Sequence, residues 1–269
     1  MFFVFDLDGV LYRETTVIKG APAAICELRR LGHKVAFATN NAMLSRRDNL
    51  KKLNKMGFKA TLPEIMASAY ATALYLTKKK TKGRSVFVIG EKGLIQELRA
   101  VGLKVYSVNS KIPKKVDYVV AGIDRKFTYK ALKIAHKFIE RGAFFIATNK
   151  DYTYPGKDGL FPGGGSIVAA VEAATGKKAF LIGKPEPFMM EKLLQQEKMS
   201  GKETFIVGDR HDTDILFGKN AKTGTVMVLT GVTSKKEAAK FKGKNKPDYI
   251  INSVCDLKKN FKLDDRNSN

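Results

Sequence analysis

The chain has 269 residues, of which 44% are hydrophobic, which is enough for one large domain or two modest domains with a sizeable core. No uninterrupted apolar stretch reaches the roughly 20 residues that a membrane span requires, and Asp6 and Asp8 interrupt the N-terminal apolar run before a signal-peptide core could form. The composition therefore argues against a membrane protein, and we expect a cytoplasmic protein without a membrane partner.

The charge balance is strongly basic. The 49 Lys and Arg residues against 26 Asp and Glu residues give a net charge of +23, which by itself suggests a nucleic-acid binder. The basic residues are spread over the whole length, however, without interleaved aromatic residues or zinc-ligand spacing. We therefore expect a solvated basic surface that draws anionic substrates, and no specific nucleic-acid partner. Cys26 and Cys255 lie in apolar helical contexts and are predicted to be buried free thiols.

The first part of the chain, to about Lys80, alternates between predicted strands and helices. Continuous apolar runs of strand length predict buried strands, and amphipathic stretches predict helices. In chain order we expect a strand at Phe2–Phe5, a helix at Ala21–Leu31, a strand at Val35–Ala38, a helix at Ser45–Met56 and a further helix from Pro63.

Two carboxylates follow the first predicted strand. Asp6 and Asp8 point the same way on an extended backbone, and Gly9 releases the chain into a turn. Such a pair suits an oxygen-bound divalent cation, and it also suits a division of labour in which one carboxylate attacks and the other carries protons. The alternative is an Asp-rich turn that caps the next helix.

A second group of polar residues, Thr39, Asn40 and Asn41, follows the strand Val35–Ala38. Their hydroxyl and amide groups can donate hydrogen bonds to phosphate oxygens, although Asn-Asn pairs are also common in turns. The stretch Lys78–Gly83 then combines charge with glycine, which predicts a linker.

The middle of the chain, roughly Gly83 to Lys178, has its own alternation of elements. We expect strands at Ser85–Ile89, Lys104–Ser107, Tyr118–Ala121 and Ala143–Ala147, with helices from Glu91 and over Tyr129–Glu140. Small residues at Gly163–Gly165 suit the crossing by which the chain returns from this insertion.

The last part, from about Ala179, again reads as alternating strands and helices. Lys184 follows a short apolar run and supplies a mobile positive charge, and Asp209 follows the strand Thr204–Val207, with Asp212 and Asp214 close behind. The remaining expected elements are helices at Pro187–Glu197, Thr213–Lys222 and Ser234–Phe241, and strands at Thr225–Leu229 and Tyr249–Ile251. The alternation predicts an α/β fold with a doubly wound parallel sheet and a phosphate site at its switch point.

The ordered set DLDGVLY, ATNN, PGGGS, GKPEP and GDRHDTDI resembles the haloacid dehalogenase (HAD) superfamily. The residues of these motifs are most similar to those of its subclass IIA, the NagD-like or 4-nitrophenylphosphatase branch, which includes phosphoglycolate and pyridoxal phosphate phosphatases. In that branch the residue after GDR is more often apolar, so His211 is a departure; it either tunes the mouth of the site or is merely exposed.

The resemblance implies a role for each matching residue. Asp6 would attack phosphorus to form an aspartyl-phosphate, and Asp8 would protonate the leaving oxygen and then activate water. Mg²⁺ would be held by Asp6, the Asp8 carbonyl and Asp209, and Asp214 would fix a metal-bound water. Thr39 and Lys184 would bind phosphoryl oxygens, and the further substrate-binding residues would be Gly9, Asn40, Asn41, Arg210 and Asp124.

The resemblance also implies a domain organisation. Residues 1–82 and 179–269 would form the HAD core, and residues 83–178 would form an inserted α/β cap of the C2a type that selects the leaving group. Within it Asp124, Arg125 and the stretch Thr148–Asp151 follow apolar runs and are candidates to face the substrate.

The function that follows is Mg²⁺-dependent hydrolysis of a small soluble phosphate ester. Asp8 and Asp209 favour this reaction over dehalogenation, which needs neither an acid for an alkoxide nor a metal. Phosphoglycolate, pyridoxal phosphate, nucleotides and sugar phosphates all remain candidate substrates, and a homodimer is one possibility. The alternatives are a phosphotransferase that uses the same intermediate and a basic nucleic-acid-associated protein whose site is vestigial.

Overall fold

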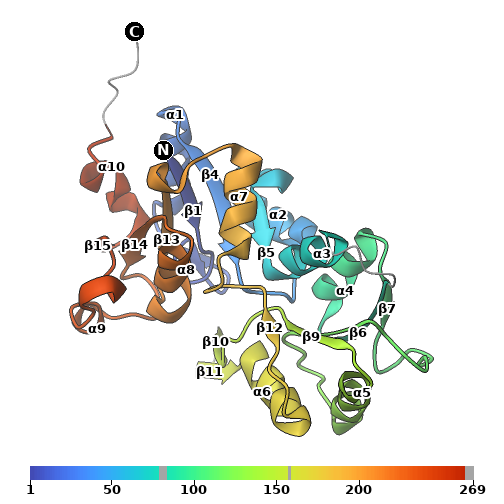
Figure 1. Cartoon of the computed structure of the whole chain (residues 1–269). Coiled ribbons are helices and arrows are strands. Elements are labelled where there is room, and N and C mark those ends of the chain that lie inside the picture. Colours follow the sequence, from blue (N-terminus) through green and yellow to red (C-terminus); the bar gives the residue numbers. More distant parts are fainter. Residues whose placement is uncertain (79–83, 157–158, 264–269) are drawn as a thin grey trace. The chain divides into compact units, whose positions relative to one another are not determined.

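The computed structural model describes residues 1–78, 84–156 and 159–263. The chain divides into two compact units, which Figure 1 colours along the sequence. Unit 1 comprises residues 1–39, 50–66 and 184–269, and unit 2 comprises residues 40–49 and 67–183. Among the described residues, no helix is both long and apolar enough to cross a membrane.

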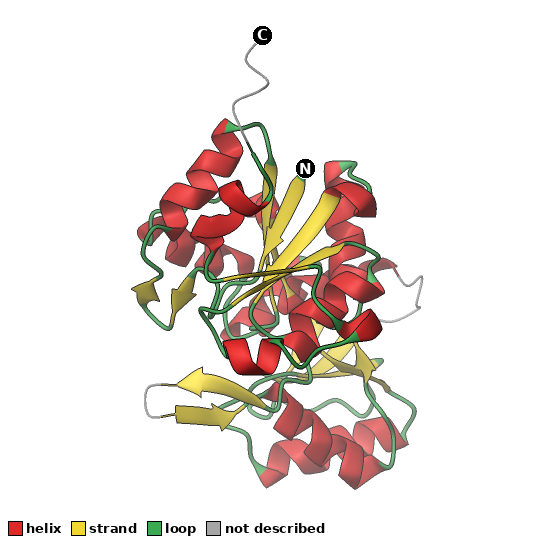
Figure 2. Ribbon diagram, turned by 90° about the vertical axis from the view of Figure 1, so that its left-hand side faces the viewer, coloured by secondary structure: helices red, strands yellow, loops and turns green. Residues whose placement is uncertain are grey.

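Unit 1 is built on a six-stranded sheet with the order β15-β14-β13-β1-β4-β5, with helices on both faces (Figure 2). Strand β1 lies in the middle of it and is buried on both faces, as its unbroken apolar sequence predicts for a central parallel strand. The strands are β1 (Phe2–Phe5), β4 (Lys34–Thr39), β5 (Ile65–Ala67), β13 (Thr204–Gly208), β14 (Gly224–Val228) and β15 (Tyr249–Ile251). The helices are α1 (Ala21–Arg30), α7 (Phe188–Glu197), α8 (Leu216–Asn220), α9 (Lys235–Ala238), α10 (Leu257–Asn260) and, from Leu50 onward, α2 (Arg46–Lys55), whose first turn belongs to unit 2. A small hairpin joins β2 (Tyr12–Arg13) to β3 (Thr16–Val17).

The register of this sheet brings three strand ends together. Phe5 of β1 pairs with Val207 of β13 on one side and with Phe37 of β4 on the other, and both pairings are parallel. The residues that follow these three strands therefore lie at the same edge. Because β4 and β13 flank β1 on opposite sides, this edge is the switch point of a doubly wound sheet, which is where such folds bind ligands.

Unit 2 has a second parallel sheet, with the order β12-β9-β8-β6-β7, and its own apolar core, which includes Phe87, Val119 and Phe138. Its strands are β6 (Ser85–Ile89), β7 (Lys104–Tyr106), β8 (Tyr118–Ala121), β9 (Phe144–Ala147) and β12 (Phe180–Leu181), and a separate hairpin contains β10 (Thr153–Gly156) and β11 (Gly159–Pro162). Its helices are α3 (Ser68–Lys78), α4 (Lys92–Ala100), α5 (Tyr129–Glu140) and α6 (Gly164–Thr175). The predicted α/β class, with parallel sheets and an inserted second α/β part, is confirmed.

Two expectations along the chain differ from the structure. The helix expected from Pro63 begins only at Ser68, because the buried residues Ile65–Ala67 form strand β5. The glycines of Gly163–Gly165 start helix α6 instead of returning the chain. A Cβ on Gly165 would lie 2.3 Å from the Lys150 carbonyl oxygen, so the small residue permits close packing there.

The expected strand after Ala179 exists, but it belongs to unit 2. Strand β12 pairs with β9, and Phe180 stacks on Tyr75 with 4.9 Å between the ring centroids. The chain returns to unit 1 only between Gly183 and Lys184. The bounds of unit 2 thus differ from the predicted insertion, residues 83–178, and most of the predicted linker, Lys78–Gly83, lies outside the described residues.

Cys26 and Cys255 are free thiols but exposed, so their predicted burial is wrong: each lies on the solvent side of its short helical segment.

The segment of residues 40–49 belongs to unit 2 because it packs against helix α4. The Gly93 amide donates to the Met43 carbonyl at 3.1 Å, and the Arg46 amide donates to the buried Glu97 carboxylate at 2.6 Å. A Cβ on Gly93 would lie only 2.4 Å from the Leu44 carbonyl carbon. This contact leaves no room for a side chain.

We therefore expect Gly93→Ala to destabilise the protein by about 1–3 kcal/mol, because the added methyl group must push backbone atoms apart. Denaturant-induced unfolding measures the change. Gln96→Ala, on the exposed face of the same helix, is the control and should leave the unfolding midpoint almost unchanged. Equal midpoints for the two variants would contradict the packing described for this segment.

Candidate active site

Lys184 is the centre of a buried ionic cluster in unit 1. Its Nζ donates to Asp6 Oδ1 at 2.5 Å, to Asp214 Oδ1 at 2.6 Å and to the Ala38 carbonyl at 3.2 Å. The lysine is 3% exposed and comes from the turn before helix α7. Asp6 directly follows strand β1, Lys184 precedes helix α7, and Asp214 lies in the helical turn after strand β13. Three separate segments of the chain therefore each contribute one charged group to the cluster.

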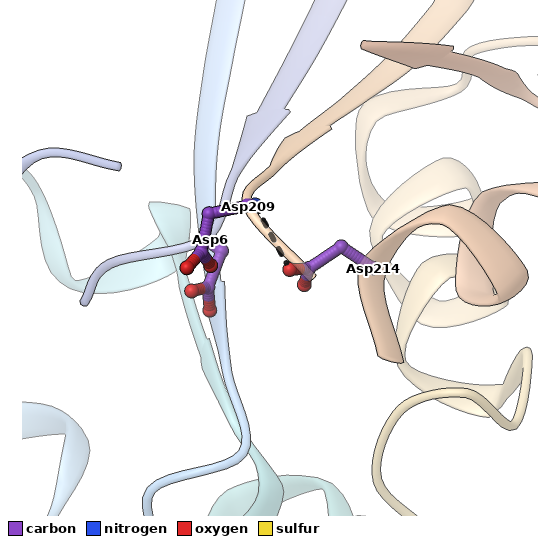
Figure 3. Close-up of side chains that lie close together, drawn as sticks. All are labelled: Asp6, Asp209 and Asp214. Carbon is purple, nitrogen blue, oxygen red and sulfur yellow. Dashed lines mark hydrogen bonds between the residues drawn. The ribbon is translucent and has the colours of Figure 1, made fainter. Parts of the chain in front are cut away.

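Asp209 and Asp214 lie beside Asp6, as Figure 3 shows. The Asp214 Oδ2 accepts the backbone N–H of Asp209 at 3.2 Å and that of Arg210 at 3.1 Å, so both of its carboxylate oxygens have partners. Asp209 Oδ2 accepts the Val232 N–H at 2.7 Å. Asp209 Oδ1 is buried and, among the described residues, has no hydrogen-bond partner.

Two glycines shape the space around Asp209. A Cβ on Gly231 would lie 1.9 Å from Asp209 Oδ2, and one on Gly9 would lie 2.5 Å from the same atom. Gly9 also has a φ of +79°, a left-handed conformation that favours glycine. Its carbonyl accepts the Thr230 hydroxyl at 2.6 Å, which ties the turn after β1 to the loop that contains Gly231.

The electrostatics of the cluster show an excess of negative charge. Burial raises the pKa of Asp6 well above its usual value, and the nearby carboxylates of Asp214 and Asp209 raise it further against the opposing effect of Lys184. Burial, followed by the charge of Asp214, raises the pKa of Asp209 to about 7. Burial disfavours the Lys184 ammonium, but Asp214 and Asp6 outweigh it and raise its pKa. An additional cation would therefore stabilise the ionised carboxylates.

The donor set fits a hard divalent cation. Asp6, Asp209 and Asp214 each offer a carboxylate oxygen, and these three oxygens lie within 4.8 Å of one another. All the offered atoms are oxygens, which are the donors that Mg²⁺ and Ca²⁺ prefer. Asp209 Oδ1, which has no hydrogen-bond partner within residues 1–78, 84–156 and 159–263, is the clearest candidate ligand, whereas Asp214 already uses both oxygens to hold Lys184 and the backbone.

Asp8 has two neighbours that the sequence analysis did not single out. The half-buried Asp8 forms an isolated backbone bridge with Tyr12, and Lys52 Nζ lies 3.8 Å from the centroid of the Tyr12 ring. Burial raises the pKa of Asp8, while the positive charges of Lys52 and Lys184 oppose the rise. Tyr12 is the last residue of the motif DLDGVLY, so the sequence did offer a signal that it lies near Asp8. Lys52 is one of 49 basic residues and gave none.

Arg210 and His211 lie in unit 1 and line a pocket of about 410 Å³ together with Asp212, Phe241 and others. The guanidinium of Arg210 faces the Asp212 carboxylate at 3.3 Å. The ring of His211 stacks on Phe241 with 3.8 Å between centroids, and its Nε2 lies 2.7 Å from the Asn245 carbonyl oxygen. The His211 side chain therefore packs against its neighbours in unit 1, which differs from the alternative that it is merely exposed.

The polar residues after Thr39 have local partners in unit 2. Thr39 itself is buried at the end of β4 in unit 1. Asn40 Nδ2 donates to Asp151 Oδ2 at 2.9 Å, and Asn41 Oδ1 accepts the Met43 N–H at 2.9 Å. The first unit boundary along the chain thus falls between Thr39 and Asn40.

Asp124 and Arg125 follow strand β8 in unit 2. Asp124 Oδ1 accepts the Lys126 N–H at 2.9 Å, which is the hydrogen bond of an Asx turn. Arg125 pairs with Glu91 through two contacts of 2.7 and 2.8 Å. The structure gives both residues a local structural partner, and their contact with substrate stays a prediction.

Comparison with family models gives two matches. A model described as haloacid dehalogenase-like hydrolase matches residues 3–104, and one described as HAD-hydrolase-like matches residues 181–257. Asp6, Asp8 and Thr39 lie within the first match, and Lys184, Asp209 and Asp214 lie within the second.

Individual proteins agree with this result. The chain is 37% identical to an acid sugar phosphatase of Staphylococcus saprophyticus, over 88% of this chain and 90% of that protein. It is 36% identical to phosphoglycolate phosphatase 2 of Arabidopsis thaliana, over 95% and 91%. The structure of a glycerol phosphate phosphatase from Mycobacterium tuberculosis, in complex with magnesium, is similar with a TM-score of 0.86 and 32% identity, over 95% of this chain and 75% of that one.

These matches cover both parts of the cluster and nearly the whole chain, and the relatives are phosphatases. The resemblance seen in the sequence is therefore confirmed. The chain belongs to the haloacid dehalogenase-like hydrolase family and is a phosphatase of its NagD-like branch.

Proposed function

We propose that this phosphatase hydrolyses a small phosphate monoester through a covalent aspartyl-phosphate on Asp6, with Mg²⁺ as its cofactor. The observation that carries the proposal is the buried cluster at the switch point. It combines an Asp6 carboxylate at the end of β1, an ammonium group 2.5 Å from it, and a buried Asp209 oxygen without a partner among the described residues. A nucleophile, a phosphate-binding ammonium group and a candidate ligand for a divalent cation are thus adjacent.

The reaction has two displacement steps. In the first, an oxygen of Asp6 attacks phosphorus, the bond from phosphorus to the ester oxygen breaks, and Asp8 gives its proton to the leaving oxygen. In the second, a water oxygen attacks phosphorus, its proton passes to Asp8, and the bond between Asp6 and phosphorus breaks. The products are the alcohol and inorganic phosphate, and both carboxyl groups return to their starting states.

Charge is the main obstacle to the first step, because a phosphate dianion must approach several carboxylates. Lys184 offsets this repulsion at Asp6, and its ammonium and the Thr39 hydroxyl are the proposed donors to the phosphoryl oxygens. Asp214 keeps Lys184 in place and holds the backbone of Asp209. When bound by Asp6, Asp209 and the Asp8 carbonyl, Mg²⁺ would neutralise charge on the carboxylates and the phosphoryl group.

The substrate class is proposed from the relatives. Their names refer to sugar phosphate, phosphoglycolate and glycerol phosphate, which are all small phosphate esters of aliphatic alcohols or acids. We propose a substrate of the same kind here. Gly9, Asn40, Asn41, Arg210 and Asp124 remain proposed substrate-binding residues, and residues 83–178 remain the proposed cap that selects the leaving group. A cytoplasmic location, a homodimer and the absence of a specific nucleic-acid partner also stay predictions.

Asp6→Asn tests the nucleophile. The amide keeps the shape of the side chain but is a poor nucleophile, so we expect kcat on a panel of phosphate esters to fall at least about 1,000-fold. The protein should remain folded by circular dichroism. Glu191→Gln makes the same chemical change at an exposed carboxylate and should keep full activity. Substantial turnover by Asp6→Asn would reject covalent catalysis by this residue.

Gly231→Ala tests the cation site without removing a carboxylate. The new methyl group would occupy the place of the Asp209 carboxylate and displace it, so we expect Mg²⁺ affinity to fall about 10-fold or more. Calorimetric titration of Mg²⁺ into the protein measures this directly. Val232→Ala changes the neighbouring residue, 51% exposed, and keeps its backbone N–H on Asp209. If both variants bound Mg²⁺ like the parent, Asp209 would not be a ligand.

A further inference from the structure

Three of the points at which the chain crosses between the units lead to one hydrogen-bonded cluster in unit 2. The chain crosses directly before Asn40, within helix α2, directly after residue 66 and directly after Gly183. Ser68, the second residue after the third crossing, donates its buried hydroxyl to the Asn40 carbonyl at 2.8 Å. A Cβ on Gly183 would lie 2.5 Å from Asn40 Oδ1, so the Gly183 backbone packs closely against this side chain. Asn40 is therefore the residue at which these three crossings meet.

Asp151 holds the side chain of Asn40. Its Oδ2 accepts hydrogen bonds from Asn40 Nδ2 at 2.9 Å and from Asn149 Nδ2 at 2.7 Å. The Asn149 amide oxygen accepts the Thr148 hydroxyl at 3.0 Å. The Thr148 carbonyl accepts the Gly183 N–H, also at 3.0 Å. These residues all belong to unit 2, and together with the serine they are here called the Asn40 cluster: Asn40, Ser68, Thr148, Asn149, Asp151 and Gly183.

The Asn40 cluster is joined to two proposed phosphate-binding residues by single peptide bonds. Thr39 directly precedes Asn40, and Lys184 directly follows Gly183. Because a peptide unit is planar and holds consecutive Cα atoms about 3.8 Å apart, a shift of Asn40 moves the end of strand β4 and the Thr39 hydroxyl with it. Hydrogen bonds weaken steeply when their distance and angle change. The cluster therefore controls how well Thr39 and Lys184 can bind a phosphoryl group.

We propose that Asp151 is a positioning residue for phosphate binding. It fixes Asn40, and through the backbone it holds Thr39 and Lys184 in the places from which they bind the phosphoryl oxygens. The inference rests on the proposed function, in which those two residues are the donors. In this role Asp151 needs no contact with the substrate, which differs from the sequence-based expectation that it faces the substrate.

Three roles of Asp151 differ in what its loss affects. A contact with the leaving group affects esters according to their leaving group, and it leaves the affinity for inorganic phosphate unchanged. A purely structural role lowers the free energy of unfolding without a change in phosphate affinity. A positioning role weakens the binding of phosphate itself and slows all esters by a similar factor, because the phosphoryl group is common to them.

Asp151→Ala removes both hydrogen bonds of Oδ2. We expect the Kd of inorganic phosphate, measured by calorimetry with Mg²⁺, to rise about 5-fold or more. We also expect kcat/KM to fall about 10-fold on glycerol phosphate and by a similar factor on 4-nitrophenyl phosphate. An unchanged Kd of phosphate, or a loss of activity on only one ester, would overturn the inference.

Two further variants accompany this test. Asp151→Asn removes the charge but keeps an oxygen that can accept both hydrogen bonds, so it should restore most of the phosphate affinity that Asp151→Ala loses. If it bound phosphate as weakly as Asp151→Ala, the role would belong to the charge and the inference would be wrong. Glu140→Ala removes a half-exposed carboxylate from helix α5 of the same unit and should behave like the parent.

Ser68 provides a second arm, which decides the matter if Asp151→Ala does not fold. Ser68→Ala removes the hydrogen bond to the Asn40 carbonyl, and we expect the Kd of phosphate to rise about 2- to 5-fold. Thr72→Val is the matched control, because it removes another buried hydroxyl of helix α3, which donates to the Ser68 carbonyl at 2.8 Å. Both variants should lower the unfolding midpoint, but only Ser68→Ala should weaken phosphate binding. Equal phosphate affinities in the two variants would overturn the inference.

Failure of this inference differs from failure of the proposed function. If the parent hydrolyses both esters and Asp6→Asn hydrolyses neither, but Asp151→Ala and Ser68→Ala bind phosphate like the parent, only the inference fails. If the parent hydrolyses neither ester, the proposed function fails and the inference falls with it.

Discussion

The ammonium group of Lys184, held between Asp6 and Asp214, is the interaction on which the site depends. Three carboxylates lie within reach of one another in a buried space, and burial alone would cost several kcal/mol per uncompensated charge. Lys184 compensates part of this charge and leaves an Asp209 oxygen for a cation. The same excess of negative charge suits the cluster to Mg²⁺, which in turn would attract a phosphoryl group.

The charged groups of the site lie at the ends of parallel strands of unit 1 and at the points where the chain crosses between the units. Asp6 and Asp209 follow β1 and β13, whose register aligns them. Thr39 is the last residue of unit 1 before the first crossing to unit 2, and Lys184 is the first residue of unit 1 after the last crossing back. The connections between the units therefore contain two of the proposed phosphate-binding residues. Gly9 and Gly231 complete the site by leaving room for the Asp209 carboxylate.

Much of the site could be predicted because its residues follow short apolar runs in an ordered set of motifs. Asp6, Lys184 and Asp209 were found in this way, and the α/β class followed from the alternation of elements. Contacts that depend on tertiary packing could not be predicted. Nothing local in the sequence shows that Phe180 and Leu181 extend the sheet of unit 2, that Gly231 abuts Asp209, or that Lys52 reaches the Tyr12 ring.

The central claim is that phosphorus becomes bonded to Asp6 during turnover. An acyl phosphate is reduced by borohydride to the alcohol, so the parent enzyme can be mixed with Mg²⁺ and 4-nitrophenyl phosphate, treated with borohydride, digested and analysed by mass spectrometry. The account predicts homoserine at position 6, formed only when both Mg²⁺ and the ester are present. An unmodified Asp6 in an enzyme that is turning over, or reduction at a different carboxylate, would contradict it.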